Sequence, residues 1–315
     1  EEMLADIKKN TVDWMNAYTD EEQEPIYLPG RIPNLIVNGT SGIAWAMACS
    51  FAPHNLIEVM NAAVHVLENP DCEVKSILDY ITGPDFPTGG LVINKNELPT
   101  AYLTGKGRAR IRGEYVIESD KKGDSIVFTS IPYKVSKEAL TVKIDELCEE
   151  GKLQGIAAIR DETNKDGVRF VIELEKGAGA STVVAKLFKL TQLENTYSFN
   201  QVALVDKKPV LMNIKQLIES YIAHQKDVLL RKTAFDLEKI KARIHILEGL
   251  LIALEDIDNI IALIKKSAST AEAKASLMAK YNFSEAQAKA ILDMKLSRLT
   301  KLETVEVQAE MDEKK

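Results

Sequence analysis

The chain has 315 residues, of which 45% are hydrophobic and 28% are charged. This is the composition of an ordinary globular protein, so it excludes wholesale disorder, and the length indicates about two or three domains. The sequence contains no run of about 18 apolar residues and does not open on a basic, then apolar leader. We therefore expect a cytoplasmic protein that has no membrane partner.

The first 25 residues carry most of the net negative charge. They contain eight acidic and two basic residues, a balance of −6 out of −7 for the whole chain. Their apolar residues predict a helix over residues 1–18, and Glu1–Leu4 resembles the middle of a helix, so we expect a fragment of a longer protein. The remainder is nearly neutral, and its local charge pattern decides what it binds.

The cysteines and histidines show no metal-ligand spacing. Cys49, Cys72 and Cys148 lie far apart, and no CxxC pair occurs. Buried or free thiols in a reducing cytoplasm explain them better than a metal site, so we predict no metal site. His65, on the apolar side of a predicted helix, is interpreted as a satisfied core histidine rather than a ligand.

Residues 25–210 alternate between helix and strand patterns, which predicts an α+β fold with antiparallel sheets. Polar caps and turn formers bound the elements. In chain order these are a helix capped by Asn55, a hairpin of strands 108–117 and 125–131, a helix from Ser136 to Gly151, a hairpin over 156–174 and a helix over 181–193.

After Pro209 the chain has no proline and a single glycine, Gly249. Apolar residues recur at alternating intervals of three and four, the pattern of a coiled-coil seam, at Leu237, Ile240, Ile244, Leu247, Leu251 and Leu254. A helix over 213–266 would be about 80 Å long, so we expect it to project from the preceding domain and to need a partner helix. Short helices are predicted over 267–303, and a polar helix follows.

Four cations alternate along one predicted strand, at Lys106, Arg108, Arg110 and Arg112. Alternate side chains share one face of a strand, so these cations would stand about 6.6 Å apart, with Ala109 and Ile111 on the opposite face. Such a row suits the phosphates of a polyanion. From spacing alone, a solvated face whose charges pair with nearby acids is an equal alternative.

Two further patterns are weaker. Asn38–Ile43 resembles a phosphate-cradling loop but lacks the lysine of a P-loop, so close backbone packing is the better interpretation. Asp161 and Glu162 beside Arg160 are interpreted as a salt-bridge cluster rather than as catalytic carboxylates. No GxSxG or HExxH motif occurs, so these residue patterns alone predict no enzyme active site.

A more specific signal comes from stretches that follow one another along nearly the whole chain. They are Leu28–Ala44, Ala52–Leu56, Gly83–Thr88, Thr104–Arg108, Ile159–Glu162, His245–Leu250 and Gln287–Met294. Together they resemble the A-subunit family of DNA gyrase, a bacterial type IIA topoisomerase. The A subunit of topoisomerase IV shares the architecture and stays open as an alternative, although two of the stretches are nearer gyrase.

The resemblance implies a domain layout that is consistent with the element pattern. The five segments are a helix at 1–24 linking from a missing winged-helix domain, a tower domain at 25–210, a coiled-coil helix at 211–266, a C-gate dimerisation domain at 267–303 and the start of a truncated return helix at 304–315.

The resemblance also implies the DNA-contacting residues. Ile43 matches the isoleucine that wedges between base pairs and kinks the duplex, although its apolar surroundings alone would place it in a core. Trp45 and Ala46 stand where the family usually has valine and glycine, a departure that bears on the depth of insertion. Contacts to the DNA backbone are expected from Arg31, Lys106, Arg108, Arg110 and Arg112.

The function implied is to hold and bend the cleaved DNA segment, and to form the exit gate, during ATP-dependent double-strand passage and supercoiling. The family cuts DNA with a tyrosine that follows an arginine on an upstream domain. None of the nine tyrosines here follows an arginine, so no catalytic residue is expected in this chain. The C-terminal wrapping domain is likewise expected to be missing.

The expected partners are the gyrase B subunit, double-stranded DNA and a second copy of the chain, which would join through the C-gate to give an A2B2 assembly. No cofactor is expected in this chain, because Mg²⁺ and ATP belong to the partner subunit in this family. The competing class is a non-enzymatic coiled-coil architectural or scaffold protein. Such a protein would bind a partner along the seam and would have no affinity for DNA.

Overall fold

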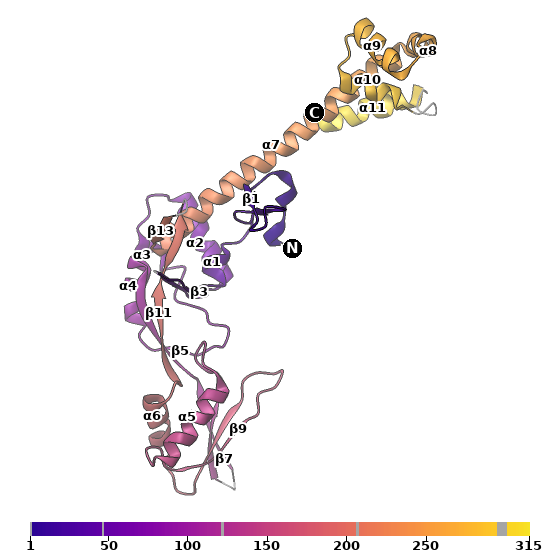
Figure 1. Cartoon of the computed structure of the whole chain (residues 1–315). Coiled ribbons are helices and arrows are strands. Elements are labelled where there is room, and N and C mark those ends of the chain that lie inside the picture. Colours follow the sequence, from indigo (N-terminus) through magenta and orange to yellow (C-terminus); the bar gives the residue numbers. More distant parts are fainter. Residues whose placement is uncertain (1, 46, 121–122, 206–207, 295–300) are drawn as a thin grey trace. The chain divides into compact units, whose positions relative to one another are not determined.

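The computed structural model shows an α+β protein with antiparallel sheets and one long helix, α7 (Ile214–Glu255), as the sequence predicts (Figure 1). It describes residues 2–45, 47–120, 123–205, 208–294 and 301–315, with the backbone only at 301–304. The chain divides into two compact units. The first contains Glu1–Met3 and Gly30–Gln225, and the second contains Leu4–Pro29 and Lys226–Lys315.

The first unit contains a five-stranded antiparallel sheet. Its strands, in spatial order, are β3 (Thr40–Ile43), β4 (Ala48–Phe51), β11 (Glu194–Asn200), β6 (Lys106–Arg112) and β5 (Leu91–Val92). The helices that accompany it are α1 (Asn34–Val37), α2 (Leu56–Glu68), α3 (Val74–Ile77) and α4 (Leu98–Thr104). Their apolar faces form one core with alternate residues of β6 and β11, including Ala109, Ile111, Tyr197 and Phe199. A hairpin, β12 (Val202–Val205) and β13 (Lys208–Leu211), precedes α7.

A second sheet in this unit has its own core. Its strands, in spatial order, are β7 (Tyr115–Asp120), β8 (Gly123–Phe128), β10 (Phe170–Leu174) and β9 (Ile156–Asp161). Helices α5 (Lys137–Glu149) and α6 (Ala180–Leu190) pack against it around Phe128, Phe170 and Leu187. As predicted, the Ser136 hydroxyl caps α5 by accepting a hydrogen bond from the Ala139 amide, and Gly151 follows the helix with a left-handed φ of +71°.

The strand predicted over 108–117 is divided into β6 and β7, which belong to different sheets. Gly113 lies at the division. Its amide donates to the Leu193 carbonyl, and a Cβ at this position would stand 2.7 Å from the Ser130 carbonyl oxygen. Close backbone approach of the next segment therefore requires a glycine at the point where the chain changes sheets.

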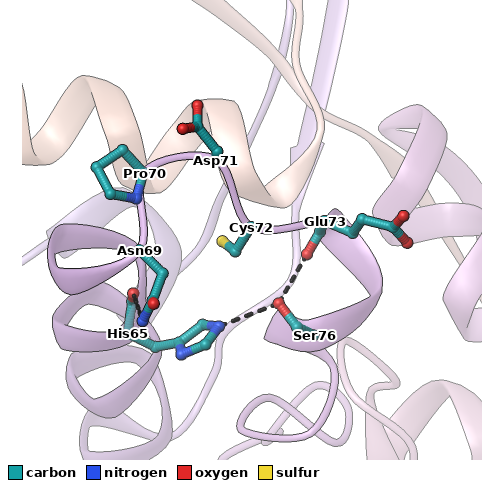
Figure 2. A pocket seen from close by; sticks show the side chains of 7 residues that line it. All are labelled: His65, Asn69, Pro70, Asp71, Cys72, Glu73 and Ser76. Carbon is teal, nitrogen blue, oxygen red and sulfur yellow. Dashed lines mark hydrogen bonds between the residues drawn. The ribbon is translucent and has the colours of Figure 1, made fainter.

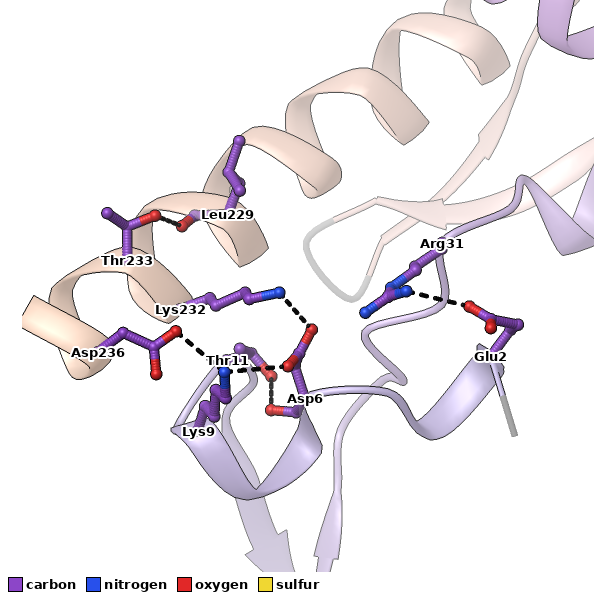
Figure 3. Close-up of polar contacts among 9 residues, drawn as sticks. All are labelled: Glu2, Asp6, Lys9, Thr11, Arg31, Leu229, Lys232, Thr233 and Asp236. Carbon is purple, nitrogen blue, oxygen red and sulfur yellow. Dashed lines mark hydrogen bonds and ion pairs between the residues drawn. The ribbon is translucent and has the colours of Figure 1, made fainter.

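The helix predicted over 1–18 is wrong. This segment contains two short 3-10 turns, Glu2–Leu4 and Ile7–Lys9, and the hairpin of β1 (Trp14–Asn16) and β2 (Gln23–Pro25). Asp6 and Asn10 adopt positive φ angles, which end a right-handed helix. Ion pairs hold the segment against α7 instead, as Figure 3 shows; they include Asp6–Lys232 at 2.8 Å and Lys9–Asp236 at 2.9 Å.

The helix predicted over 213–266 is interrupted. α7 ends at Glu255, and a separate helix, α8 (Ile257–Lys266), follows Asp256. Asp256 has a non-helical φ of −120°, and its carboxylate accepts hydrogen bonds from Tyr281 and Asn259. These side-chain bonds stabilise the interruption, and the Tyr281 hydrogen bond also lowers the pKa of Asp256.

The short helices predicted over 267–303 are present up to residue 294, and residues 295–300 of that range lie outside the described residues. They are α9 (Thr270–Tyr281) and α10 (Glu285–Leu292), and α11 (Lys301–Lys314) follows. Ser284 and Gln287 form a capping box at the start of α10. α10 packs closely on α7, because the Gln287 side chain donates to the His245 carbonyl and a Cβ at Gly249 would meet that side chain. In the part of the chain that is described, no helix is long and apolar enough to span a bilayer.

Candidate nucleic-acid interface

The cationic segment is the strand β6, with the alternation that the sequence predicts. Lys106, Arg108 and Arg110 are exposed, whereas Ala109 and Ile111 are buried in the core. These three cations are called the basic strand below. On the neighbouring strand β11 they face Asn200, Ser198 and Thr196 respectively, which are small or neutral side chains. Lys106 and Arg108 also line a shallow hollow with Ser198 and Asn200, so an anion can approach them from solvent.

Arg112 differs from the other three cations. Its guanidinium donates two hydrogen bonds to the Glu194 carboxylate, at 3.0 and 2.6 Å, and lies 4.5 Å from the centre of the Phe188 ring. Arg110 stands 3.8 Å from the same carboxylate. Neither Lys106 nor Arg108 lies within ion-pair distance of an acid among the residues described. The four cations therefore differ in how closely they approach an acid. Arg112 is paired with a nearby acid, which is the alternative to phosphate binding that the spacing left open.

The hairpin β3–β4, called the apolar hairpin, exposes hydrophobic residues at its tip. Ile43, which is 93% exposed, pairs with Ala48, and the Ala44 amide donates to the Met47 carbonyl at 2.7 Å. Trp45 lies in the turn between them and is fully exposed. Ile43 is thus not a core residue, the place that its apolar surroundings alone would give it.

Two polar side chains that the sequence analysis missed hold the apolar hairpin. The Asn200 amide donates to the Ala48 carbonyl, and Asn200 pairs with both Ser50 and Lys106. Asn200 therefore joins the apolar hairpin to the basic strand. Since only β11 lies between β4 and β6, the backbones of these two strands are about 10 Å apart.

Lys134 is the second of these side chains. Its ammonium donates to the Ser41 hydroxyl at 2.6 Å, and its backbone has a left-handed φ of +66°. The contact joins residues that are 93 positions apart in the sequence. No local motif marks either Lys134 or Asn200.

Arg31 lies outside the sheet that contains the basic strand, on the segment that leads into α1. Its guanidinium forms an ion pair with Glu2 at 3.3 Å, and its carbonyl accepts a hydrogen bond from the Tyr221 hydroxyl at 2.6 Å. About half of the side chain is exposed. Its expected contact with DNA stays a prediction.

The structure explains the weaker sequence patterns as packing. Gly39, in the loop that resembles a phosphate cradle, has a φ of +64°, and a Cβ there would meet the Phe51 carbonyl oxygen. Close backbone packing is therefore confirmed. Arg160 pairs with Glu173 at 2.6 Å and with Glu162 at 3.4 Å, which confirms the salt-bridge cluster. The three cysteines are free, as expected.

A shallow pocket lies where α2 ends and α3 begins, and Figure 2 shows its lining residues, His65, Asn69, Pro70, Asp71, Cys72, Glu73 and Ser76. The His65 ring is half-buried and lies 3.0 Å from the Ser76 hydroxyl, which in turn donates to the Glu73 carbonyl. His65 is therefore satisfied by protein partners, as predicted, but it lies at the edge of a shallow pocket rather than in the core. Among the described residues, no three His, Cys, Asp or Glu side chains are grouped so that they could hold a metal ion.

A buried histidine fixes the base of the apolar hairpin. His54 follows β4; its ring lies 3.0 Å from the Ile36 carbonyl and 2.8 Å from the Tyr102 hydroxyl. Burial lowers the pKa of His54, so the ring is neutral at neutral pH, and burial raises the pKa of Tyr102. The hairpin therefore has a buried, hydrogen-bonded base and an exposed apolar tip.

The comparison with known proteins decides the family. A family model for the A subunit of DNA gyrase and topoisomerase IV matches residues 1–315. The chain belongs to this family. Among the relatives of this gyrase/topoisomerase IV A-subunit chain, the DNA gyrase A protein of Streptococcus pneumoniae (strain TIGR4) is 47% identical over 313 residues. The DNA gyrase A proteins of Streptococcus pyogenes serotype M3 and Clostridium acetobutylicum are 46% and 45% identical. The alignments cover 99% of this chain and 38% of each relative.

Proposed function

We propose that this chain is the DNA-holding and DNA-bending part of the A protein of a type IIA topoisomerase. The observation that carries the proposal is the pairing of Asn200 with both Ser50 and Lys106. It places an exposed row of cations and a hairpin with an exposed Ile43 in one sheet. Cations bind the phosphate backbone without reading sequence, and an apolar wedge opens a base step and kinks the duplex.

Salt dependence tests the role of the basic strand. The double variant Lys106→Ala/Arg108→Ala should bind duplex DNA more weakly, and the slope of log K against log salt should fall by about 0.9 for each phosphate that is no longer neutralised. The measurement is a DNA titration at several salt concentrations. A matched control, Lys165→Ala/Lys176→Ala, removes the same charge from two exposed turns. An unchanged slope in the first variant, or an equal decrease in the control, would contradict the proposal.

We further propose that the parent assembly is a gyrase rather than a topoisomerase IV, with the B subunit, a second A chain and DNA as partners. The support is that the relatives above bear the name of DNA gyrase. In this proposal ATP and Mg²⁺ are bound by the B subunit, and DNA cleavage depends on a tyrosine of a preceding domain. Supercoiling measured on the parent protein together with a B subunit tests it, because relaxation or decatenation alone would favour topoisomerase IV.

Exposed apolar residues on α7 support a partner helix in the proposed coiled coil. Leu237 and Ile240 of the predicted seam are exposed, and so are Leu229 and Leu230 before them. Leu247 of the seam is buried within the second unit. Polar substitution of Leu237 and Ile240 should therefore weaken the packing of the partner helix on α7, measured as a loss of helical circular dichroism, and leave DNA binding intact. Loss of DNA binding in that variant would contradict this division of roles.

A further inference from the structure

The tip of the apolar hairpin carries an aromatic side chain that the proposed function does not use. Trp45 is fully exposed, and the neighbouring Ile43 and Met47 are 93% and 42% exposed. Tryptophan normally buries most of its ring in a core or an interface. Three large apolar side chains together at a hairpin tip therefore indicate a surface that a binding partner covers.

The charges near this tip indicate what the partner is. The Lys134 ammonium contacts Ser41, two residues before Ile43, and Lys106 lies two strands from β4, paired with Asn200 of the strand between them. An apolar tip beside cations is complementary to duplex DNA, in which apolar base faces lie between phosphate strands. The opposing surface of a protein groove would itself need acidic residues to match these cations.

We propose that Trp45 is a second DNA-contacting residue, whose indole stacks on a base beside the step that Ile43 opens. This inference rests on the proposed function and extends it to a wedge of two residues. When a base step is opened, base faces that were stacked on each other become exposed to water unless a side chain covers them. An indole covers such a face whatever the base, because every base presents a π surface. Trp45 therefore stabilises the kinked duplex without selecting a sequence.

Tryptophan fluorescence tests this contact directly. The chain contains two tryptophans, Trp14 and Trp45, so Trp14→Phe leaves Trp45 as the sole reporter and Trp45→Phe leaves the matched control. Each variant is titrated with a duplex that has flexible pyrimidine–purine steps at its centre. Binding is followed by the anisotropy of a label on the DNA, and bending by energy transfer between the labelled DNA ends.

Stacking should quench the emission of Trp45 at least twofold and protect it from acrylamide, while Trp14 in the control stays unchanged. If DNA binds and bends in an Ile43-dependent manner but Trp45 emission and acrylamide access do not change, this inference fails and the proposed function stands. If the chain does not bind DNA, the proposed function fails first. Emission that depends on protein concentration without DNA would assign the tip to a second copy of the chain and overturn the inference.

Substitution provides an independent readout. Trp45→Ala should weaken binding to the bent duplex by roughly tenfold, since stacking of one base is typically worth that much, and the fraction of bent DNA should fall. Trp45→Phe retains a ring and should restore most of the bending. Equal loss in both variants, or none in either, would contradict stacking. Because the Trp45 side chain is exposed, the thermal unfolding of both variants should match that of the parent chain.

Discussion

The chain contains two antiparallel hairpins that use apolar residues in opposite ways. In β7–β8, the residues Ile126, Val127 and Phe128 are completely buried, and Ile126 and Phe128 lie beneath α5 and α6. In β3–β4, Ile43 and Trp45 project into solvent, while the base of the hairpin is fixed by His54 and Phe51. The first hairpin stabilises the fold through the apolar residues of its inner strand, β8. The second leaves its apolar tip exposed.

The difference lies in the inner strand and the tip of each hairpin. β8 lies between β7 and β10, and helices cover its apolar face. β3 and β7 are both edge strands whose residues are all exposed, but only in β3–β4 do exposed apolar residues, Ile43 and Trp45, reach the described part of the hairpin tip. An edge hairpin with an apolar tip is an aggregation hazard in a protein that does not use it for binding. The exposed tip is therefore best explained by a binding function.

The largest expected effect separates the two hairpins by stability. Phe128→Ala should destabilise the first unit by about 3–5 kcal/mol, because it removes a buried ring and leaves a cavity. Ile43→Ala should change stability by less than about 0.5 kcal/mol and abolish DNA bending instead. Urea unfolding and end-to-end energy transfer measure the two effects. A strongly destabilised Ile43→Ala variant, or normal bending by it, would remove the distinction.

A smaller effect is expected at the two ends of β6. Arg112→Ala should cost about 1–2 kcal/mol of stability, because it removes both hydrogen bonds to Glu194 Oε2 and uncovers Phe188. The salt slope of DNA binding should hardly change. Arg108→Ala should do the reverse, lowering the slope at unchanged stability. If the two variants show the same stability and the same salt slope, the pairing with Glu194 does not distinguish Arg112 from Arg108.

Removal of the bond that holds the apolar hairpin should have a still smaller effect on stability. Lys134→Met and Ser41→Ala should each cost about 0.5–1 kcal/mol, and the double variant should cost little more than either, because both remove the same hydrogen bond. Both should reduce bending to the same degree. If Lys134→Met alone lowers the salt slope, the lysine contacts phosphate directly instead of positioning the hairpin through Ser41.

The smallest effect is a pH dependence at the base of the apolar hairpin. The pKa of His54 is lowered in the folded state from its ordinary value of 6.5. Below pH 6.5 the unfolded chain therefore takes up a proton at His54 that the folded chain does not. The contribution of neutral His54 to the free energy of unfolding is thus complete above pH 6.5 and is lost as the pH falls. As the pH is lowered from about 7.5 to about 5.5, the urea concentration at the unfolding midpoint should decrease in the parent chain and should decrease less in His54→Asn. The same substitution at half-buried His65 serves as the control, and an equal drop in the parent chain and in His54→Asn would exclude His54 as the cause.

Local signals in the sequence predicted much of the fold. Asn55 and Ser136 cap helices because the cap depends on the residue and the next three amides. The alternation of β6 was visible because strand periodicity is also local. The helix predicted over 1–18 was wrong because the backbone turns at Asp6 and Asn10, and because Asp6 and Lys9 contact α7, more than 200 residues away, which local propensity does not reveal.

The candidate site was also predictable only where local sequence signals determine it. Its cations were found from their spacing, but the pairing of Arg112 with Glu194 joins residues 82 apart and could not be predicted. Whether Ile43 is buried or exposed depends on which elements cover β3, which a run of apolar residues does not reveal. The contact between Lys134 and Ser41 was equally invisible, because no local motif requires it.

The composition of β11 has a consequence for the electrostatic field of the whole sheet. Glu194 neutralises the arginine opposite it, whereas Ser198 and Asn200 stand in the same relation to Arg108 and Lys106 without a charge. The charge available to an anion along β6 therefore depends on the residues of β11, the strand that carries no cation. A single acidic replacement at Ser198 would convert an attracting position into a self-compensated one while every arginine stays in place.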